Sequence, residues 1–256
     1  MARRLIVTRP AAQGTPWVQA LRAQGVDAVA LPLIGIEPLA DAAPVRRAWA
    51  ELPTFHWVMF VSANAVEHFF ASRPDGAAWP AGLAAGAPGP GTKSSLQVAG
   101  LHLVDEPVPG RADSEGLWAQ VALRGWQGRR VLVVRGEDGR DWLAEQLREA
   151  GAEVVFLAAY RRAPPVLDAD AASALAVAAA APRQHAFAFG SSEAVARLRE
   201  LAPQADWAAA LALAGHPRIA EAARAAGFGQ VQVLLPQDDL AQGAAAMAAA
   251  LRAGAS

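Results

Sequence analysis

The fold is decided by the segment Val154-Val155-Phe156-Leu157-Ala158-Ala159-Tyr160-Arg161-Arg162-Ala163-Pro164-Pro165, which carries the only tyrosine of the chain. Its apolar first half predicts a buried strand, and the proline pair ends that strand because proline has no N–H for a neighbouring strand. A similar pattern stands earlier, in Ala28-Val29-Ala30-Leu31-Pro32-Leu33-Ile34-Gly35-Ile36-Glu37-Pro38. Pro38 and Pro164 are 126 positions apart. We therefore expect two equivalent chain crossings between the halves of a duplicated protein.

The same spacing of 126 positions recurs over a whole strand and helix. Arg3-Arg4-Leu5-Ile6-Val7-Thr8-Arg9 matches Arg129-Arg130-Val131-Leu132-Val133-Val134-Arg135 at this distance. Three further matched pairs are Leu21 with Leu147, Gly25 with Gly151, and Asp27 with Glu153. The pairs include a buried helix face and the glycine that ends the helix. Agreement of these features at one spacing indicates an internal duplication.

The later elements repeat at slightly different spacings. Residues 56–66 resemble residues 185–195 at a distance of 129, and each stretch predicts a strand, a small polar turn and a helix. Gly100-Leu101 pairs with Gly227-Phe228 at a distance of 127. Each half therefore offers about five strands with interleaved helices. This pattern predicts an α/β protein of two similar doubly wound parallel-sheet domains, flavodoxin-like in architecture.

The order of the repeated parts predicts that one domain is inserted into the other. The discontinuous domain would span 1–36 and 166–256, and the inserted domain would span 42–154. Two linker strands, at 31–38 and 157–165, would join them. A simple split of the chain at its midpoint is the alternative that the repeat leaves open.

Composition excludes several classes of chemistry. The chain has 256 residues, no cysteine and a formal net charge of −1. The missing cysteine excludes disulfides and thiolate chemistry, and the balanced charge argues against a broad surface for nucleic acid. The apolar run after the first arginines is too short for a signal peptide, and no apolar run is long enough to span a membrane. We expect a cytoplasmic monomer that binds neither nucleic acid nor membrane.

Several segments, taken in order along the chain, together resemble the uroporphyrinogen-III synthase family. They are Val7-Thr8-Arg9-Pro10, Phe60 to Val66, Asp113 to Leu117, Val134 to Glu137, Tyr160-Arg161 and Leu213 to Ala220. No single motif is specific, whereas the ordered set covers nearly the whole chain. The resemblance implies two α/β domains joined by a two-stranded linker, with the active site in the cleft between them. It also implies a cofactor-free enzyme of tetrapyrrole biosynthesis with no metal.

A member of this family closes the linear tetrapyrrole hydroxymethylbilane into uroporphyrinogen III. The resemblance implies loss of the hydroxyl group as water, attack from the substituted carbon of ring D, and a spiro-pyrrolenine intermediate that recloses with ring D inverted. Such a reaction depends mainly on how the flexible substrate is held. The expected activity is therefore that of a lyase whose product is a precursor of heme and other porphyrins.

Tyr160 is the candidate for a catalytic role. It matches the tyrosine at this point of the family, and a phenol that faces the cleft would assist departure of the hydroxyl as a general acid. The alternatives are a cleft contact without chemistry, and a ring that packs the hinge while its hydroxyl satisfies a backbone group.

Three turns that open helices are candidates for binding the substrate carboxylates. Helix N-termini attract anions because their first N–H groups are unpaired. The turns are Ser62-Ala63-Asn64, Gly190-Ser191-Ser192 and Gly89-Pro90-Gly91-Thr92, in which Ser62, Ser191, Ser192 and Thr92 add hydroxyl donors. Ordinary N-capping is the simpler interpretation, and it is compatible with ligand binding.

Four charged or polar residues complete the predicted site. Arg9 and Arg135 follow equivalent strands, at the carboxyl ends where open α/β sheets bind ligands. Where many family members carry a threonine in the turn Gly-x-x-Thr-Ala, this chain has Ile219, so the role of that hydroxyl does not transfer. His216 or Arg218 is expected to take over the carboxylate contact.

Two other functions are compatible with the duplication. A cytoplasmic two-domain protein that binds a small molecule at a hinge, without catalysis, would show the same repeat. A nucleotide-dependent α/β enzyme would need a glycine-rich phosphate loop after the first strand, and residues 8–14 and 134–140 supply none.

Overall fold

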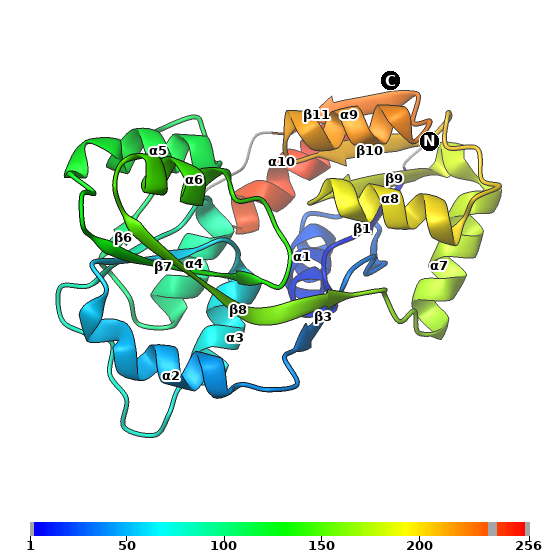
Figure 1. Cartoon of the computed structure of the whole chain (residues 1–256). Helices are drawn as coiled ribbons and strands as arrows, with labels where there is room; N and C mark the ends of the chain where they lie inside the picture. Colours follow the sequence, from blue (N-terminus) through cyan, green and yellow to red (C-terminus); the bar gives the residue numbers. More distant parts are fainter. Residues whose placement is uncertain (1–2, 235–239, 254–256) are drawn as a thin grey trace. The chain divides into compact units, whose positions relative to one another are not determined.

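The chain folds into two compact units. The computed structural model describes residues 3–234 and 240–253. Unit 1 comprises Met1–Gly35 and Ala163–Ser256, and unit 2 comprises Ile36–Arg162. Each unit is an α/β domain built on its own sheet (Figure 1).

Unit 1 contains a five-stranded sheet in which all paired neighbours are parallel. Its order is β11-β10-β9-β1-β2, with bounds Gln230–Val233, Leu211–Ala214, His185–Phe189, Arg4–Val7 and Ala28–Ala30. The helices are α1 (Ala11–Ala23), α7 (Ala169–Ala180), α8 (Ser192–Leu201), α9 (Pro217–Ala225) and α10 (Leu240–Ala253), with the short η3 (Pro182–Gln184) before β9. Counted in chain order within the unit, the strands stand 2-1-3-4-5, which is the flavodoxin-like order.

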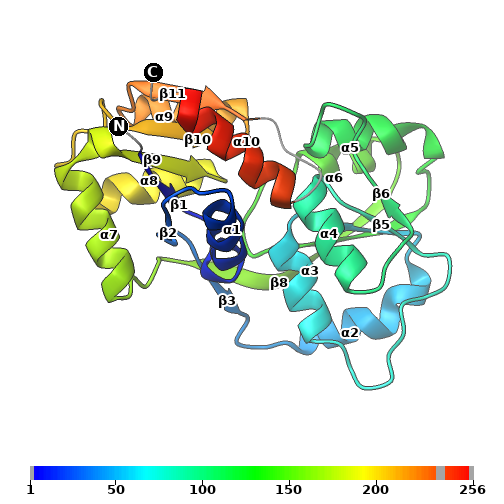
Figure 2. The same ribbon diagram turned by 180° about the vertical axis from the view of Figure 1, so that it is seen from behind.

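Helices cover both faces of the unit 1 sheet. Leu5 and Val7 on β1 pack with Val18 and Leu21 of α1 and with α10, which lies beside α1 (Figure 2). The opposite face, nearer the viewer in Figure 1, is covered by α8 and α9. The alternation of Leu5 and Val7 on one face follows from the two-residue period of a strand.

Unit 2 contains a six-stranded sheet of order β3-β8-β7-β4-β5-β6. The strands are Gly35–Pro38, Glu153–Ala163, Arg130–Gly136, Trp57–Phe60, Ala84–Gly86 and Val104–Asp105. The pairs from β8 to β6 are parallel. The helices are α2 (Ala43–Glu51), α3 (Ala63–Ala71), α4 (Pro90–Val98), α5 (Ser114–Val121) and α6 (Trp142–Glu149), with the short η1 (Leu52–Thr54) and η2 (Ala122–Arg124).

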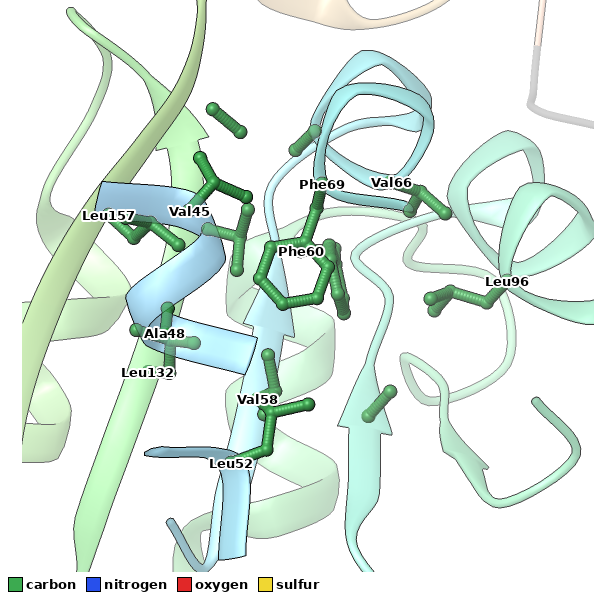
Figure 3. Close-up of a cluster of buried hydrophobic side chains, with 14 of the residues drawn as sticks. Val45, Ala48, Leu52, Val58, Phe60, Val66, Phe69, Leu96, Leu132 and Leu157 are labelled. Carbon is green, nitrogen blue, oxygen red and sulfur yellow. The ribbon is translucent and has the colours of Figure 1, made fainter. Parts of the chain in front are cut away.

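The unit 2 sheet also has a core on each face. On one face Val58 and Phe60 of β4 pack against α2, α3 and α4, and Figure 3 shows Phe60 beside Phe69 of α3. On the other face Trp57 and Met59 pack against α5 and α6. Both units are therefore doubly wound, as the sequence predicted.

Strand pairing repeats between the units residue by residue. Leu5 pairs with Ala28 in unit 1, and Val131 pairs with Val154 in unit 2, so both members of the pair are shifted by 126 positions. Leu5 also pairs with Ala186, and Val131 pairs with Trp57, which lies 129 positions before Ala186. Ala212 with Val231 and Ala85 with Val104 repeat the spacing of 127. The three spacings found in the sequence are thus the spacings of equivalent sheet positions.

Glycine ends equivalent helices in both units. Gly25 after α1 has a φ of 75°, and Gly151 after α6 has a φ of 90°. These are left-handed values that a residue without Cβ adopts at little cost, as expected for the residue after a helix.

The two segments expected to be linker strands differ from the strands observed. The first contains a shorter strand, and most of the second belongs to a strand of the unit 2 sheet. Within 31–38 only Gly35–Pro38 is a strand. The N–H groups of Leu31 and Leu33, on either side of Pro32, donate to the backbone oxygens of Val7 and Thr8 without forming a regular strand. The segment expected at 157–165 is part of β8, which begins at Glu153 and ends at Ala163, directly before the two prolines. Since β8 pairs with β7 as far as Tyr160, residues 155–162 belong to unit 2, beyond the predicted end of the inserted domain at 154.

Candidate active site

In unit 2 the predicted site residues lie toward the carboxyl edge of the sheet. Ser62 follows β4, Arg135 is near the end of β7, and Tyr160 is in the last part of β8. Thr92 lies in the first turn of α4, which follows β5. Because these four strands are parallel, their carboxyl ends share one edge.

The hydroxyl groups of Tyr160 and Ser62 link strand β8 to the turn before α3. Their oxygens lie 3.2 Å apart. Ser62 also caps α3, because its Oγ accepts a hydrogen bond from the N–H of Ala65 at 3.2 Å. A serine oxygen accepts two hydrogen bonds and donates one. When Ser62 accepts from both Ala65 and Tyr160, its own proton remains available for a further acceptor.

Tyr160 is buried, with 1% of its surface exposed. Its ring belongs to the hydrophobic core of unit 2. That the phenol faces the cleft stays a prediction from the sequence. Among the described residues, the hydrogen-bond partner of the hydroxyl is the side chain of Ser62, whereas the packing interpretation named a backbone group. A ligand atom would therefore need a path through Ser62, or a local movement, to reach the phenol.

Gly136 makes room for the Tyr160 ring. A Cβ atom at Gly136 would lie 3.1 Å from Cε2 and Cζ of Tyr160, closer than ordinary contact. The pairing of β7 with β8 also shifts here, so that Gly136 pairs with Tyr160 and Ala159 is skipped. A bulge of this kind redirects a side chain near the end of a strand.

His68 of α3 is a neighbour that the sequence did not indicate. Its ring is stacked on Tyr160 with 5.7 Å between centroids and 27° between planes. Burial lowers the pKa of His68, and the charge of Glu67 opposes this shift. Nothing local in the sequence marks His68, since its contact with Tyr160 spans two distant segments of the chain.

Arg135 is held inside unit 2 by residues near it. The guanidinium forms an ion pair with Asp141 and lies 4.9 Å from the centre of the Phe156 ring. Its Nε atom is buried and has no hydrogen-bond partner among the described residues. An anion that binds Arg135 would therefore compete with Asp141 or approach the Nε side.

The turn before α4 combines an open backbone with a buried threonine. Gly89 is the N-cap residue and supplies no side-chain hydrogen bond to the helix. The space beside Gly91 is open, because a Cβ atom there would meet nothing within 4 Å. The next residue, Thr92, is buried, with 6% of its surface exposed. The first amides of α4 thus lack a side-chain cap, which suits an external acceptor. Ala63, in the first turn of α3, adds a small residue at the equivalent place after β4.

In unit 1 the predicted residues gather around the beginnings of α8 and α9. Ser191 caps α8 by accepting from the N–H of Ala194 at 3.1 Å, and His216 caps α9 through Nδ1, which accepts from the N–H of Arg218 at 3.1 Å. The hydroxyl of Ser192 donates to the backbone oxygen of Arg218 at 3.4 Å. Ser191, Ser192, His216 and Arg218 therefore form one cluster after β9 and β10.

Arg9 and Ile219 lie at the margin of this cluster. The Arg9 guanidinium is 4.7 Å from the centre of the Trp17 ring, and it comes within 3.9 Å of the Cβ position of Gly190. Burial lowers the pKa of Arg9, although arginine stays protonated at ordinary pH. Ile219 is a buried residue of α9 and has no hydroxyl to offer a ligand.

Two findings concern metal ions and membranes. Across residues 3–234 and 240–253, no three His, Asp or Glu side chains are close enough to hold a metal ion. Within the same part of the chain, no helix has the length and apolar character needed to cross a bilayer.

The sequence matches a known family over most of its length. Residues 15–234 match the model of the family described as uroporphyrinogen-III synthase HemD. The uroporphyrinogen-III synthase of Chlorobaculum parvum is 30% identical over 170 residues, which cover 64% of this chain and 65% of that protein. The enzyme of the same name from Salmonella typhimurium is 32% identical over 159 residues, covering 62% of this chain and 64% of that protein. The aligned regions thus span slightly less than two thirds of these relatives.

Solved structures share the fold. A mutant uroporphyrinogen III synthase from the extremely thermophilic bacterium Thermus thermophilus superposes with a TM-score of 0.60 at 20% identity, covering 98% of this chain and 100% of that one. The uroporphyrinogen-III synthetase of Helicobacter pylori gives a TM-score of 0.57 at 15% identity with the same coverage. At these identities the likeness concerns the fold, whereas the match of residues 15–234 concerns the sequence itself. The chain belongs to the uroporphyrinogen-III synthase family.

Proposed function

We propose that this protein is a uroporphyrinogen-III synthase, a lyase that converts hydroxymethylbilane into uroporphyrinogen III and water. The observation that carries the proposal is the family match across residues 15–234. The polar residues at the carboxyl edges of both sheets support it, because an enzyme that holds a flexible polyanion needs many hydrogen-bond donors. The reaction would take place in the cytoplasm, as we expect from the sequence.

The donors at the two carboxyl edges would bind the substrate carboxylates. In unit 2 these are the amides that begin α3 and α4, with Ser62, Ala63 and Thr92, and the guanidinium of Arg135. In unit 1 they are the amides that begin α8 and α9, with Ser191, Ser192, His216, Arg218 and Arg9. Backbone amides at helix starts are neutral donors that do not titrate, so they bind a carboxylate without a change in their protonation. Eight carboxylates on the substrate match a site built from dispersed donors.

Tyr160 would supply the proton for loss of the hydroxyl group, and Ser62 would pass it on. The contact of 3.2 Å permits the phenol to donate to Ser62 while Ser62 donates to the departing oxygen. The hydroxyl then leaves as water, and the substituted carbon of ring D attacks the resulting azafulvenium cation to give the protonated spiro-pyrrolenine. Fragmentation and closure at the free carbon of ring D release one proton, which restores the phenol. Tyr160 thus acts through Ser62, which touches the reacting oxygen.

An isomer assay tests the proposal. The purified protein is incubated with freshly made hydroxymethylbilane, and the oxidised products are separated into the type I and type III isomers. We expect type III to exceed type I, because the unassisted closure gives the uninverted type I isomer. A product mixture equal to that of a protein-free control would contradict the enzymatic function. Saturable binding of the substrate without type III product would favour the alternative of a binding protein without catalysis.

A further inference from the structure

A polar pocket lies at the amino edge of the unit 1 sheet, opposite the carboxyl edge described above. Its volume is about 450 Å³, and it is lined by Arg3, Arg183, Ala208, Ala209 and Gln230. Arg3 precedes β1, Arg183 lies in η3 before β9, the two alanines precede β10, and Gln230 begins β11. Because the strands are parallel, all of these positions share the edge opposite to the candidate active site of the unit.

Arg3 is fixed in the pocket while one of its donors stays unused. Its Nε donates to the backbone oxygen of Arg183 at 3.2 Å, and one terminal nitrogen donates to Oε1 of Gln230 at 2.8 Å. The other terminal nitrogen is buried and has no hydrogen-bond partner within the described part of the chain. A buried donor without an acceptor costs free energy, so this arrangement favours an additional acceptor in the pocket.

Positive charge in the pocket is not balanced by a side chain of the described residues. The pKa of Arg3 is lowered first by burial and then by the charge of Arg183. Within residues 3–234 and 240–253, the ion pairs found include no carboxylate on Arg3 or Arg183. Asp206, two residues before Ala208, accepts a hydrogen bond from the N–H of Ala208 at 2.9 Å and, among the described residues, forms no ion pair with either arginine. Two guanidinium groups therefore face one pocket without a counter-ion from this part of the chain.

The duplicated fold does not require this pair. Arg129 occupies the position of Arg3 in unit 2, but Thr54 stands where unit 1 has Arg183. There the adjacent Arg130 donates to Thr54 and forms an ion pair with Glu153. The equivalent ion pair in unit 1 joins Arg4 to Asp27, so the difference between the two edges is the second arginine, Arg183, which the duplicated fold does not require.

We propose that the pocket of Arg3 and Arg183 binds a phosphate group, either free or on a small organic molecule. A tetrahedral phosphate carries close to two negative charges at neutral pH and offers oxygens to two guanidinium forks at once. A single carboxylate brings one charge and two oxygens, so it matches this pair less well. The ligand would bind without displacing a substrate from the carboxyl edge of the unit.

Binding to the full-length protein is measured by isothermal titration with inorganic phosphate and, separately, with methyl phosphate. Sodium chloride at equal ionic strength is the reference. We expect saturable binding of phosphate that weakens at least about tenfold in Arg183→Gln, since losing one charge-assisted contact costs about this factor. Tighter binding of methyl phosphate than of inorganic phosphate would identify an organic phosphate as the ligand type.

Arg224→Gln is the matched control, because it removes an arginine of α9 that does not line the pocket. It should bind phosphate as the unsubstituted protein does. Arg3→Gln should also weaken binding, and thermal unfolding checks that this variant is folded. Absence of saturable binding, or equal binding by Arg183→Gln and the unsubstituted protein, would overturn the proposal. Neither outcome depends on the isomer assay, so the pocket and the synthase activity are tested separately.

Discussion

At the residue scale, Tyr160 and Ser62 join a buried phenol to a serine that caps a helix. The phenol is almost completely covered, whereas Ser62 is only half-buried. Ser62 has the acceptor capacity for both Ala65 and Tyr160, which leaves its proton for a ligand. In the proposed mechanism Ser62 would be the group that meets the substrate, and Tyr160 would be the group behind it.

We predict that Tyr160→Phe and Ser62→Ala each lower the kcat for type III formation by about 100-fold. The double variant should lose little more than either single variant, because both residues serve one proton transfer. The measurement is the initial rate in the isomer assay at saturating substrate. Fully multiplicative losses, or a Ser62→Ala variant with nearly unchanged kcat, would show that the phenol does not act through Ser62.

His68 connects the same cluster to the pH dependence of stability. Burial lowers its pKa, so the unfolded chain takes up a proton at higher pH than the native protein does. The free energy of unfolding is therefore unaffected by the titration of His68 above about pH 6.5, the ordinary pKa of histidine. It decreases as the pH falls below this value, because the unfolded chain then binds a proton that the native protein does not.

We predict that His68→Gln flattens the decline of unfolding free energy between about pH 7 and pH 5, because one source of proton uptake on unfolding is removed. Urea unfolding at a series of pH values measures this slope. His102→Gln, which removes an exposed imidazole of the same unit, is the control. A slope for His68→Gln equal to that of the unsubstituted protein would rule out this contribution of His68.

At the element scale, several helices begin with side-chain caps, and the equivalent helices α1 and α6 end at glycines. Ser62 and Ser191 accept from the N–H three residues later, as their residue types and positions led us to expect. The cap of α7 is of the same kind, since Asp168 accepts from the N–H of Ala171 at 2.8 Å. Such caps act over one turn of chain, which is why the sequence alone indicates them.

We predict that Asp168→Ala lowers the unfolding free energy by about 1 kcal/mol, because it leaves an N–H of α7 unpaired. Asp170→Ala is the matched control, since it removes a first-turn carboxylate that does not cap the helix, and it should cost only a few tenths of a kcal/mol. Urea unfolding gives both values. Equal effects of the two substitutions would show that charge near the helix start, and not the cap, stabilises α7. Asp168→Ala also serves as a cap-loss control for Ser62→Ala.

At the scale of the whole molecule, duplication explains why two units share one strand order and one set of pairing registers. Leu21 on α1 and Leu147 on α6 are equivalent positions, and both side chains are completely buried. Their neighbours differ in sequence, while the place each leucine occupies beneath its sheet is the same.

We predict that Leu21→Ala and Leu147→Ala each destabilise the unit that contains them by about 3 kcal/mol, through lost burial and the cavity left behind. Chemical unfolding followed by circular dichroism measures the two losses. Leu123→Ala is the control, because Leu123 is fully exposed, and its effect should stay within about 0.5 kcal/mol. A loss several times larger in one unit would mean that the two cores are not equivalent.

Sequence by itself determined the duplication, the α/β class, the helix caps and the family. Each of these depends on periodic patterns, on local turn chemistry or on matching residues, all of which are readable along the chain. The match of Arg4 with Arg130, for instance, needed only a constant spacing.

Tertiary structure alone decided what lies around the candidate site. It joined β3 and the whole of β8 to the sheet of unit 2, buried Tyr160, stacked His68 on it, and paired Arg135 with Asp141. It also brought Arg3 and Arg183 into one pocket. Most of these contacts join segments distant in sequence, and their strength depends on burial and packing that no local pattern contains. The physical reason is that local hydrogen bonds shape an element, whereas long-range packing sets the surroundings of each side chain.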